Sequence, residues 1–412
     1  MSDPTLFSAG FNGRPTGSDA LFRSFWMAGY EGADHVNSAG VQLSMNEANH
    51  HWQRLESDYA LLAQFGIRTV RESIGWRVTE QMGDAGFARL RAHAELAEKQ
   101  GIEVIWTLMH YGWPADIDLL SPAFVQRFAA FAEKVAMTLR GVSDSQRFYQ
   151  PVNEISFLSW ALSATGLMQH AMRDPSWANG PAVKLQLVRA ALRACEVIEQ
   201  RDPAARFMHS DPLIHVVPPP DAPFELVQAA RSHSDAVFEA WDMLSGRAEP
   251  QLGGSARHLG IVGINYYHDN QWMLQGDGPL HWHLGDPRRK PLHHLIEAIR
   301  QRYQAPMLLA ETSHVGEGRG QWLDDVAREV MLCRKSGMPL EGICLYPIVD
   351  RHGWDDVSHW HNSGLWEVEV PCAGAGQSPY ERILCRPYAE QLWRWQEHLP
   401  GGPRPTAEVS SL

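Results

Sequence analysis

The chain has 412 residues, of which 44% are hydrophobic and 20% are charged, and its formal net charge is −12. This composition is typical of a globular protein with a sizeable core, and it excludes a disordered chain. The negative charge argues against a protein that binds nucleic-acid backbones, because such a protein needs a basic face and the sequence has no long Lys/Arg cluster.

The N-terminus and the cysteines indicate a cytoplasmic protein without a membrane partner. The stretch MSDPTLFSAGFNGRPTG lacks the basic flank and apolar core of a secretory signal, and no segment approaches the length of a membrane span. The five cysteines are scattered, odd in number and without a Cys-x-x-Cys pair. They therefore predict a reducing compartment and neither a disulfide framework nor a zinc knuckle.

Helical and strand-like patterns alternate along the chain. In two places a stretch of helical period is closed by a glycine, Gly66 or Gly101, and is followed by a run rich in β-branched and aromatic residues. The same alternation recurs to the end of the chain. The strands that we expect are 24–30, 69–76, 103–110, 147–154, 205–211, 259–267, 306–313 and 341–350.

These strands and the helices between them predict the fold. The expected helices include 121–140, 181–201, 224–244, 292–303, 319–336 and 387–396. Eight strand-like runs with intervening helices predict an α/β fold, a closed parallel (β/α)8 TIM barrel, with functional groups at the carboxyl ends of its strands. An open doubly wound sheet is the alternative, but no glycine-rich phosphate loop follows the first strand.

The whole barrel is expected to form one domain spanning 21–400, preceded by an N-terminal extension at 1–20 and followed by a flexible tail at 401–412. Three stretches that each follow a predicted strand are polar, aromatic and rich in glycine and proline. They are 155–180, 268–290 and 351–380, and we expect them to be long loops over the carboxyl-terminal face.

Two glutamates stand at the carboxyl ends of predicted strands. Glu154 ends RFYQPVNE and Glu311 lies in LLAETS, so the barrel would bring them to the same face. Glycoside cleavage needs two facing carboxyls, one to protonate the leaving oxygen and one to attack the anomeric carbon or activate water. The structural alternative is that each glutamate caps a helix or pairs with a surface cation.

Five motifs resemble, in the same order, those of the family 1 β-glycosidases in clan A of the glycoside hydrolases. RESIGWRVTE resembles their Arg-x-Ser-x-x-Trp, TLMHYGWP their Thr-Leu-x-His-Trp-x-x-Pro, and VNEI their Asn-Glu-Pro. GINYY resembles their Gly-x-Asn-Tyr-Tyr, and YPIVDRHGW their Trp-Ser-x-x-Asp-x-x-x-Trp. One such motif would be weak, but five in order over roughly residues 24 to 400 form a specific signal.

The resemblance implies a role for each matched residue. Glu154 would be the acid/base and Glu311 the nucleophile of a retaining double displacement. Arg71 and Tyr266 would contact Glu311 and keep it ionised and oriented. The residues that would bind the sugar are His110 and Asn153, through its hydroxyls, and Trp354, by stacking on its face.

The sequence also departs from the family pattern. The usual Thr-Glu-Asn-Gly around the nucleophile is replaced by AETSHVG, and Asn-Glu-Pro by NEI. Gly353 stands where many members carry a sugar-binding glutamate, and Tyr346 replaces a tryptophan. The first strand keeps Glu-Gly-Ala but lacks the preceding glutamine, so Glu31 either compensates or forms a structural salt bridge. Glucose or galactose specificity is therefore not implied.

The resemblance thus implies a glycoside hydrolase that acts on a soluble, small glycoside or oligosaccharide without a cofactor or metal. Transglycosylation would use the same residues. One alternative is a catalytically silent barrel that binds carbohydrate or a partner protein. Another is a metal-dependent barrel hydrolase, since the chain contains His-Trp-His at 281–283 and His-His pairs at 50 and 293, but none of these follows the pattern of ligands at strand ends.

Overall fold

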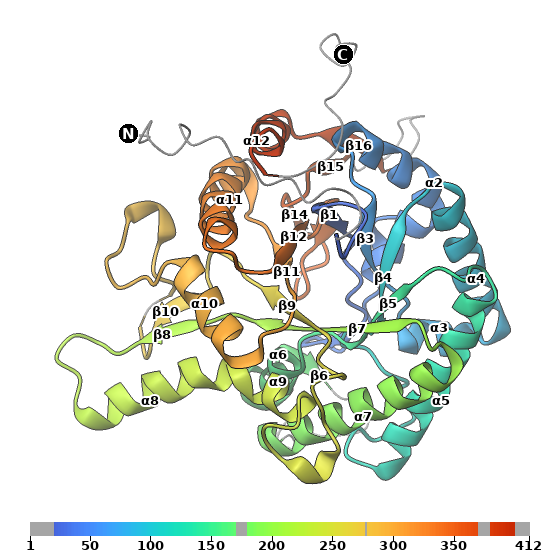
Figure 1. The fold of residues 1–412 in the computed structure, drawn as a ribbon, viewed down its shortest axis with the longest axis horizontal. Helices are drawn as coiled ribbons and strands as arrows, with labels where there is room; N and C mark the ends of the chain where they lie inside the picture. Colours follow the sequence, from blue (N-terminus) through green and yellow to red (C-terminus); the bar gives the residue numbers. More distant parts are fainter. Residues whose placement is uncertain (1–19, 170–178, 277, 370–379, 400–412) are drawn as a thin grey trace.

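The protein is a closed barrel of parallel strands surrounded by helices (Figure 1). The computed structural model describes residues 20–169, 179–276, 278–369 and 380–399. In these ranges the barrel has eight strands, in the spatial order β1-β12-β11-β9-β7-β5-β4-β3, and each neighbouring pair is parallel. They are β1 (Trp26–Gly29), β3 (Thr69–Ser73), β4 (Glu103–Met109), β5 (Arg147–Val152), β7 (Ala205–Pro212), β9 (Ile261–Asn265), β11 (Met307–Thr312) and β12 (Leu340–Leu345). The predicted (β/α)8 barrel is confirmed, and every strand overlaps its predicted range.

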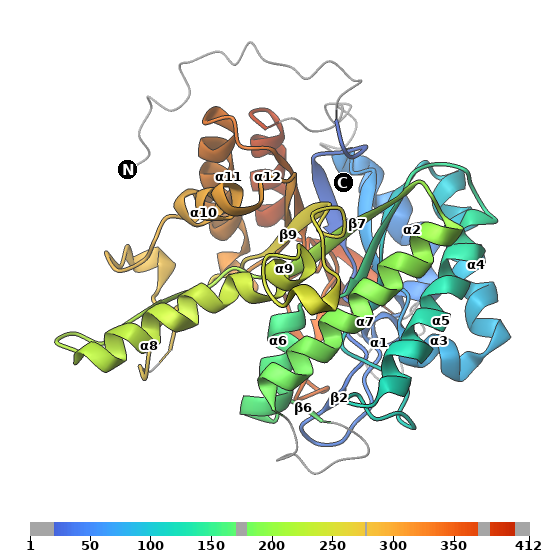
Figure 2. The same ribbon diagram turned by 60° about the horizontal axis from the view of Figure 1, so that its bottom comes forward.

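Helices enclose the barrel in both views (Figures 1 and 2). The longer ones are α2 (His51–Leu62), α4 (Asp84–Lys99), α5 (Pro122–Arg140), α7 (Gly180–Arg201), α8 (Phe224–Asp235), α10 (Leu292–Tyr303), α11 (Arg319–Lys335) and α12 (Arg386–Gln396). The predicted helix at 224–244 is divided into α8, the 3₁₀ turn η5 (Ala236–Phe238) and α9 (Glu239–Leu244). The shorter helices are α1 (Met45–Ala48), α3 (Trp76–Met82) and α6 (Ile155–Trp160).

Helices α5 and α7 show how particular residues determine where a helix begins and which of its faces is buried. Pro122 lies in the first turn of α5, where its missing N–H leaves no hydrogen bond unmade. Phe124, Phe128 and Phe131 follow at intervals of four and three residues, so they share one face and are buried. Asn179 caps α7, because its side chain accepts a hydrogen bond from the backbone N–H three residues later. The two helices pack against each other.

The core has two parts that follow from the alternation of side chains along each strand. In β4, Ile105 belongs to the cluster inside the barrel and Trp106 to the larger cluster between strands and helices. The inner cluster includes Phe22 and Phe148, near the amino ends of the strands, whose ring centroids are 4.8 Å apart. The amino end of the barrel is therefore closed by apolar side chains, and polar groups are left for the other end.

The stretch predicted as a loop at 155–180 begins as a helix, which corrects that prediction. Its apolar residues Ile155 and Leu158 are buried, and they form α6 and then the π-helical turn η3 (Ala161–Thr165). β6 (Met168–Gln169) follows and pairs with β2 (Val36–Asn37). Residues 170–178 lie outside the described part of the chain.

The other two predicted loops carry only short elements. The stretch 268–290 contains β10 (Gln271–Met273), which pairs with β8 (His215–Val217), and the turn η7 (Trp282–Leu284). The stretch 351–380 contains β13 (Arg351–His352), β14 (Trp360–His361) and β15 (Trp366–Glu369), the last paired with β16 (Glu381–Leu384).

Most of the predicted extension at 1–20 and the whole predicted tail at 401–412 lie outside the described residues, so the domain boundaries stay predictions. Across the described ranges, every helix is too short or too polar to cross a bilayer.

Candidate active site

The predicted site residues come from several strands and gather at the carboxyl end of the barrel. Glu311 lies in β11 and Arg71 in β3, while His110 follows β4 directly. Asn153 and Glu154 follow β5, and all five side chains are buried. This placement follows from the parallel barrel, in which every strand delivers its carboxyl end to the same face.

Glu311 is held by two donors. Nη1 of Arg71 lies 2.8 Å from Oε1, and the hydroxyl of Tyr267 donates to Oε2 at 2.8 Å. The Arg71 and Glu311 side chains are only 1% and 5% exposed, so little water screens this ion pair. Both oxygens of Glu311 therefore interact with groups that favour a negative charge.

Arg71 connects the two carboxyl-bearing strands. Its Nη2 donates to Oε1 of Gln150 at 2.8 Å and to Oδ1 of Asn153 at 3.0 Å. The guanidinium carbon also lies 5.0 Å from the ring centroid of Tyr346. Burial lowers the pKa of Arg71, but the opposing contributions, of which the charge of Glu311 is the largest, together outweigh burial and raise the pKa above its ordinary value. The site thus contains a permanent buried cation beside Glu311.

Glu154 has a different environment. Nδ2 of Asn265 donates to its Oε1 at 2.8 Å, and the hydroxyl of Tyr111 donates to its Oε2. Burial and the negative charge on Glu311 raise the pKa of Glu154 to about 8, although the hydrogen bonds from Tyr111 and Asn265 lower it. The side chain is therefore protonated near neutral pH while Glu311 is paired with a cation.

Asn265 links the two carboxyls through the sheet. It ends β9 and is in register with Glu311 of β11, while its side chain bonds Glu154. Glu154 itself has φ of 48° and is the N-cap of α6, and its backbone N–H donates to the carbonyl of Ser210 at 3.1 Å. A glutamate in this left-handed conformation is unusual, and the hydrogen bonds on its backbone and side chain hold it there.

The prediction that the Tyr266 side chain contacts Glu311 is wrong, because Tyr267 makes this contact. The Tyr266 hydroxyl instead accepts from Gln271 at 2.8 Å and Arg289 at 3.0 Å, and its ring stacks on Trp322. Only the backbone N–H of Tyr266 reaches Glu311, donating to its carbonyl oxygen at 2.9 Å. The side chains of neighbouring residues in an extended chain point to opposite sides. Tyr267 therefore faces the site, and Tyr266, one position earlier, faces away from it.

His110 and Asn153 lie in the site and contact each other. Nδ2 of Asn153 lies 3.0 Å from Nε2 of His110, and Nδ1 of His110 lies 2.9 Å from the Ser73 hydroxyl. Burial and the positive charge of Arg71 lower the pKa of His110 well below its ordinary value, so the ring is neutral. A sugar hydroxyl could reach these two side chains only by exchanging with contacts that they already make.

Trp354 lies at the edge of this group. It is half-buried, and its ring meets His35 edge to face with centroids 5.1 Å apart. Arg351 lies over the ring, with 5.2 Å between the guanidinium carbon and the centroid. Nε of Arg351 also lies 3.2 Å from Oε2 of Glu31. The buried Glu31 thus forms an ion pair in the site with the half-buried Arg351.

Two departures from the family pattern, at Gly29 in β1 and at Tyr346 just after β12, are in direct contact. A Cβ built on Gly29 would lie 2.0 Å from a ring carbon of Tyr346, so the tyrosine occupies the space that a side chain at position 29 would need. The hydroxyl of Tyr346 lies 3.3 Å from Nδ1 of His110. Tyr346 therefore fills part of the barrel mouth where the first strand lacks the family's glutamine.

Sequence reasoning did not select Tyr111, Tyr267 or Asn265. Tyr111 stands where the family motif Thr-Leu-x-His-Trp-x-x-Pro has a tryptophan. This difference in residue type was the signal that could have identified Tyr111 as a site residue. Tyr267 and Asn265 both lie in the quoted motif GINYY. Across the described ranges, no group of three or more His, Cys, Asp and Glu side chains is arranged to hold a metal.

At the mouth of this (β/α)8 barrel, Glu311 is paired with Arg71, whereas burial raises the pKa of Glu154. These features define a class of barrels suited to acid–base chemistry. A model of glycosyl hydrolase family 1 matches residues 33–243, just over half of the chain. The chain therefore belongs to glycosyl hydrolase family 1, which confirms the resemblance carried by its five motifs.

Two solved structures are similar over most of the chain. The AHE enzyme from Alicyclobacillus herbarius is 17% identical, with a TM-score of 0.70 over 92% of this chain and 98% of that chain. The β-glucosidase from Thermotoga maritima in complex with glucoimidazole is 15% identical, with a TM-score of 0.68 over 90% and 98%. At these identities the likeness concerns the fold.

One curated relative matches part of the chain. It is 6-phospho-beta-glucosidase AscB of Escherichia coli (strain K12), which is 26% identical over 159 residues. The match covers 36% of this chain and 33% of the relative, so the chain spans about a third of that protein's length.

Proposed function

We propose that this protein is a retaining β-glycosidase that hydrolyses a soluble, small glycoside or oligosaccharide. The observation that carries the proposal is the contrast between the two carboxyls. Glu311 is bonded to Arg71 and Tyr267, whereas burial and the charge of Glu311 raise the pKa of Glu154. A double displacement needs one carboxylate that acts as the nucleophile and one protonated carboxyl that acts as the acid.

In the first step Glu311 attacks the anomeric carbon, and Glu154 donates its proton to the leaving oxygen. The bond to the leaving group breaks as an ester forms between the sugar and Glu311. Formation of this ester removes the negative charge that helps to raise the pKa of Glu154. Glu154 can then accept a proton from water, which attacks the anomeric carbon and releases Glu311.

The surrounding residues have supporting roles in this proposal. Arg71 and Tyr267 orient Glu311, while Asn265 and Tyr111 orient Glu154. His110, Asn153 and Trp354 are proposed to bind the sugar being transferred. We assign no particular sugar, because Gly353 and the Tyr346-filled space over Gly29 replace groups that bind sugar in the family. Another sugar could replace water in the second step and give transglycosylation.

The proposed location is the cytoplasm. The four cysteines among the described residues are free, as expected for a protein kept under reducing conditions; they are Cys195, Cys333, Cys344 and Cys385. Cys372 lies outside the described residues.

Release of nitrophenol from a panel of aryl β-glycosides tests the function directly. Wild type should turn over at least one member, and product analysis by proton NMR should show the β-anomer first. Glu311→Ala should lower the rate by about 10⁴-fold or more, since no group remains to form the ester. Added azide should then restore turnover and give a product of inverted configuration.

Glu317→Ala is the matched control, because Glu317 is exposed six residues after Glu311 and should be dispensable. Equal activity of wild type and Glu311→Ala would remove Glu311 from the mechanism. Saturable sugar binding without turnover by the wild type would instead favour the alternative of a carbohydrate-binding barrel.

A further inference from the structure

The side-chain amide of Asn153 has one possible orientation in the site, because Arg71 fixes it. A guanidinium can only donate hydrogen bonds, so Arg71 requires an acceptor oxygen at both amides that it contacts, Oε1 of Gln150 at 2.8 Å and Oδ1 of Asn153 at 3.0 Å. The amide nitrogen of Gln150 donates to the same Oδ1 at 2.8 Å, and the Ser210 hydroxyl donates to it at 3.0 Å. Three donors thus meet one oxygen, and the NH₂ group of Asn153 points the other way.

This NH₂ group faces His110 and Tyr111. The nitrogen lies 3.0 Å from Nε2 of His110, and it donates to the Tyr111 hydroxyl at 3.2 Å. Its two hydrogens therefore match two neighbours. Because an amide NH₂ group cannot accept a hydrogen bond, Nε2 of His110 is the acceptor in this contact and carries no hydrogen.

The other ring nitrogen of His110 has partners that adapt to it. Oγ of Ser73 lies 2.9 Å from Nδ1, and the Tyr346 hydroxyl lies 3.3 Å from it. A hydroxyl can donate or accept, so these two groups impose neither tautomer. The ring is neutral, because burial and Arg71 lower its pKa, and a neutral ring carries one hydrogen. That hydrogen lies on Nδ1, where Ser73 can accept it.

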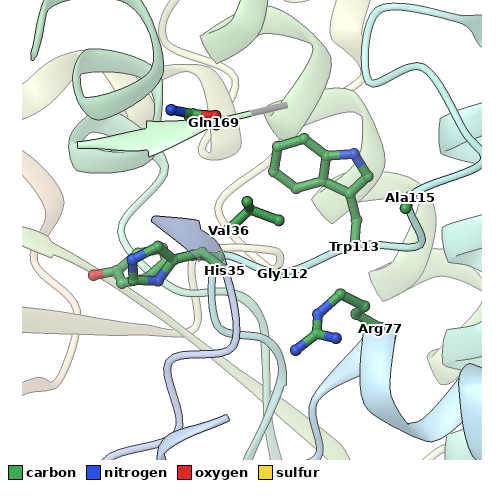
Figure 3. Close-up of a pocket in the computed structure, with 8 residues that line it drawn as sticks. His35, Val36, Arg77, Gly112, Trp113, Ala115 and Gln169 are labelled. Carbon is green, nitrogen blue, oxygen red and sulfur yellow. The ribbon is translucent and has the colours of Figure 1, made fainter. Parts of the chain in front are cut away.

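A nearby carboxyl, Glu31, would favour the opposite tautomer. Its Oε1 lies 3.8 Å from Nε2 of His110, too far for a hydrogen bond, and it already accepts from the backbone N–H of Ala33 at 3.0 Å. The contact with Asn153 is therefore the stronger constraint. It is also shielded, since Asn153 and His110 are 0% and 1% exposed and neither lines the small pocket that Figure 3 shows beside Trp113.

We propose that Arg71, through Asn153, fixes neutral His110 in the tautomer with its hydrogen on Nδ1, so that the site presents His110 to the sugar as an acceptor. Asn153 is then a positioning residue as well as a contact of the sugar. A free hydroxyl that replaces the present contact donates to Nε2 and can accept from Asn153. A sugar methylated on that oxygen has no hydrogen to donate and would leave Nε2 buried without a partner. The conclusion about the sugar rests on the proposed function, whereas the tautomer does not.

Nitrogen NMR of protein labelled with ¹⁵N-histidine measures the tautomer without any turnover. Correlations between the ring nitrogens and the ring C–H hydrogens distinguish a nitrogen that carries a hydrogen from one that does not. The signals of His110 are those that disappear in His110→Gln. The wild type should show a hydrogen on Nδ1 of His110 and none on Nε2.

Asn153→Asp tests the cause. A carboxylate can only accept, so Nε2 of His110 should gain a hydrogen in this variant. If Asn153→Asp does not fold, Asn153→Ala removes the donor without adding a charge, and Glu31 should then favour a hydrogen on Nε2. His209 is the internal control. It is also buried, burial lowers its pKa to about 3, and its Nε2 faces Cys195 at 3.9 Å, so its signals should not move.

The contact with the sugar is tested by adding the 1-thio analogue of the best substrate in the aryl glycoside panel to the labelled wild type. The Nε2 signal of His110 should shift while this nitrogen stays without a hydrogen. One monodeoxy derivative of the analogue, the one that lacks the donating hydroxyl, should bind about 10-fold more weakly and should not cause this shift.

A hydrogen on Nε2 of His110 in the wild type, free or with the thioglycoside, would overturn the inference and leave the glycosidase standing. An unchanged tautomer in the folded Asn153 variant would overturn it as well. If the panel yields no substrate, the proposed function fails together with the conclusion about the sugar, and the spectrum of the free protein still decides the tautomer.

Discussion

Both carboxyl oxygens of Glu154 accept hydrogen bonds from other segments of the barrel. Asn265 is the donor to Oε1 and Tyr111 the donor to Oε2. When Glu154 is protonated, the proton must lie on one of these oxygens, and the Tyr111 hydroxyl can reverse its role and accept it, whereas the Asn265 amide can only donate. Tyr111 can therefore keep a hydrogen bond to Glu154 in both protonation states, as donor to the carboxylate and as acceptor from the protonated carboxyl.

Replacing Tyr111 by Phe tests this relationship. The hydrogen bond from Tyr111 lowers the pKa of Glu154, so its loss should raise that pKa further. The alkaline limb of the kcat/KM profile should move to higher pH, because the acid form of Glu154 would persist longer. We also expect kcat to fall by about 10-fold from poorer orientation. The measurement is kcat/KM against pH on the best aryl glycoside.

Tyr149→Phe provides the comparison. Tyr149 is equally buried, but its hydroxyl bonds Asp202 at 2.9 Å and not a carboxyl of the site. This variant should lose stability without a shift of the alkaline limb. An unmoved limb in Tyr111→Phe would show that Tyr111 does not influence the protonation of Glu154.

The site residues illustrate which details a motif can predict. The motif GINYY placed two tyrosines near the nucleophile, but which of them faces Glu311 depends on how the chain leaves β9. Tyr111 was not selected because its contact with Glu154 depends on a left-handed backbone conformation, with φ of 77°. Such choices follow from backbone geometry, which a short motif does not specify.

At the scale of elements, an ionic cluster fixes the strand that carries Arg71. Glu72 of β3 lies 3.1 Å from Nε2 of His51 in α2, and Nδ1 of His51 lies 2.8 Å from Asp58. Arg382 of β16 also binds Asp58 at 2.8 Å. All four groups are almost completely buried, so β3, α2 and β16 are held together by charges in a region with little water.

This cluster predicts a decline of stability at alkaline pH. Burial lowers the pKa of His51, but Glu72 and Asp58 outweigh it and raise the pKa to about 9. A raised pKa means that the contribution is complete below about 6.5, the unfolded value, and is lost as the pH rises through about 9. The free energy of unfolding should fall over this range by about 3 kcal/mol.

The same interaction has an acid limit. The pKa of Glu72 is lowered to about 2: burial raises it, but the charges of His51 and His93 together with their hydrogen bonds outweigh this. Its contribution is therefore complete above about 4.5 and is lost as the pH falls through about 2. Urea unfolding from pH 5 to pH 10 should give a weaker alkaline decline in His51→Gln/Glu72→Gln, which keeps hydrogen-bonding groups without charges. Equal slopes in both proteins would contradict the assignment.

At the scale of the whole molecule, the residues that stabilise the barrel and the residues proposed for catalysis lie at opposite ends of its axis. Phe22 and Phe148 close the amino end, and the carboxyls lie at the other end. Phe22→Ala should lower the free energy of unfolding by about 3 to 5 kcal/mol, because a buried aromatic ring is lost from a packed core. Below the melting transition kcat/KM should stay within about 2-fold of wild type.

Trp354→Ala is the converse variant at the open end. It should lower kcat/KM while costing less stability, since Trp354 is only half-buried. Calorimetric melting and the aryl glycoside assay measure both quantities. A loss of activity in folded Phe22→Ala as large as that in Trp354→Ala would show that the two ends are coupled.

The sequence by itself determined the barrel, its strands and the approximate extent of most of its longer helices, although the helix predicted at 224–244 is divided into α8, η5 and α9. The period of apolar residues and the glycines after helices act locally, so they can be read along the chain. It also predicted that Glu154 and Glu311 share one face, because strand ends in a parallel barrel meet there. The loop predicted after β5 was wrong because Ile155 and Leu158 gain burial by forming α6.

The tertiary structure alone decided which side chains contact those carboxyls. Tyr111 and Asn265 reach Glu154 from segments 43 and 111 residues away in the chain, and Arg71 reaches Glu311 across 240 residues. The protonation of Glu154 likewise depends on burial among distant segments. Burial and charge act through space, so their effects are set only when the barrel closes.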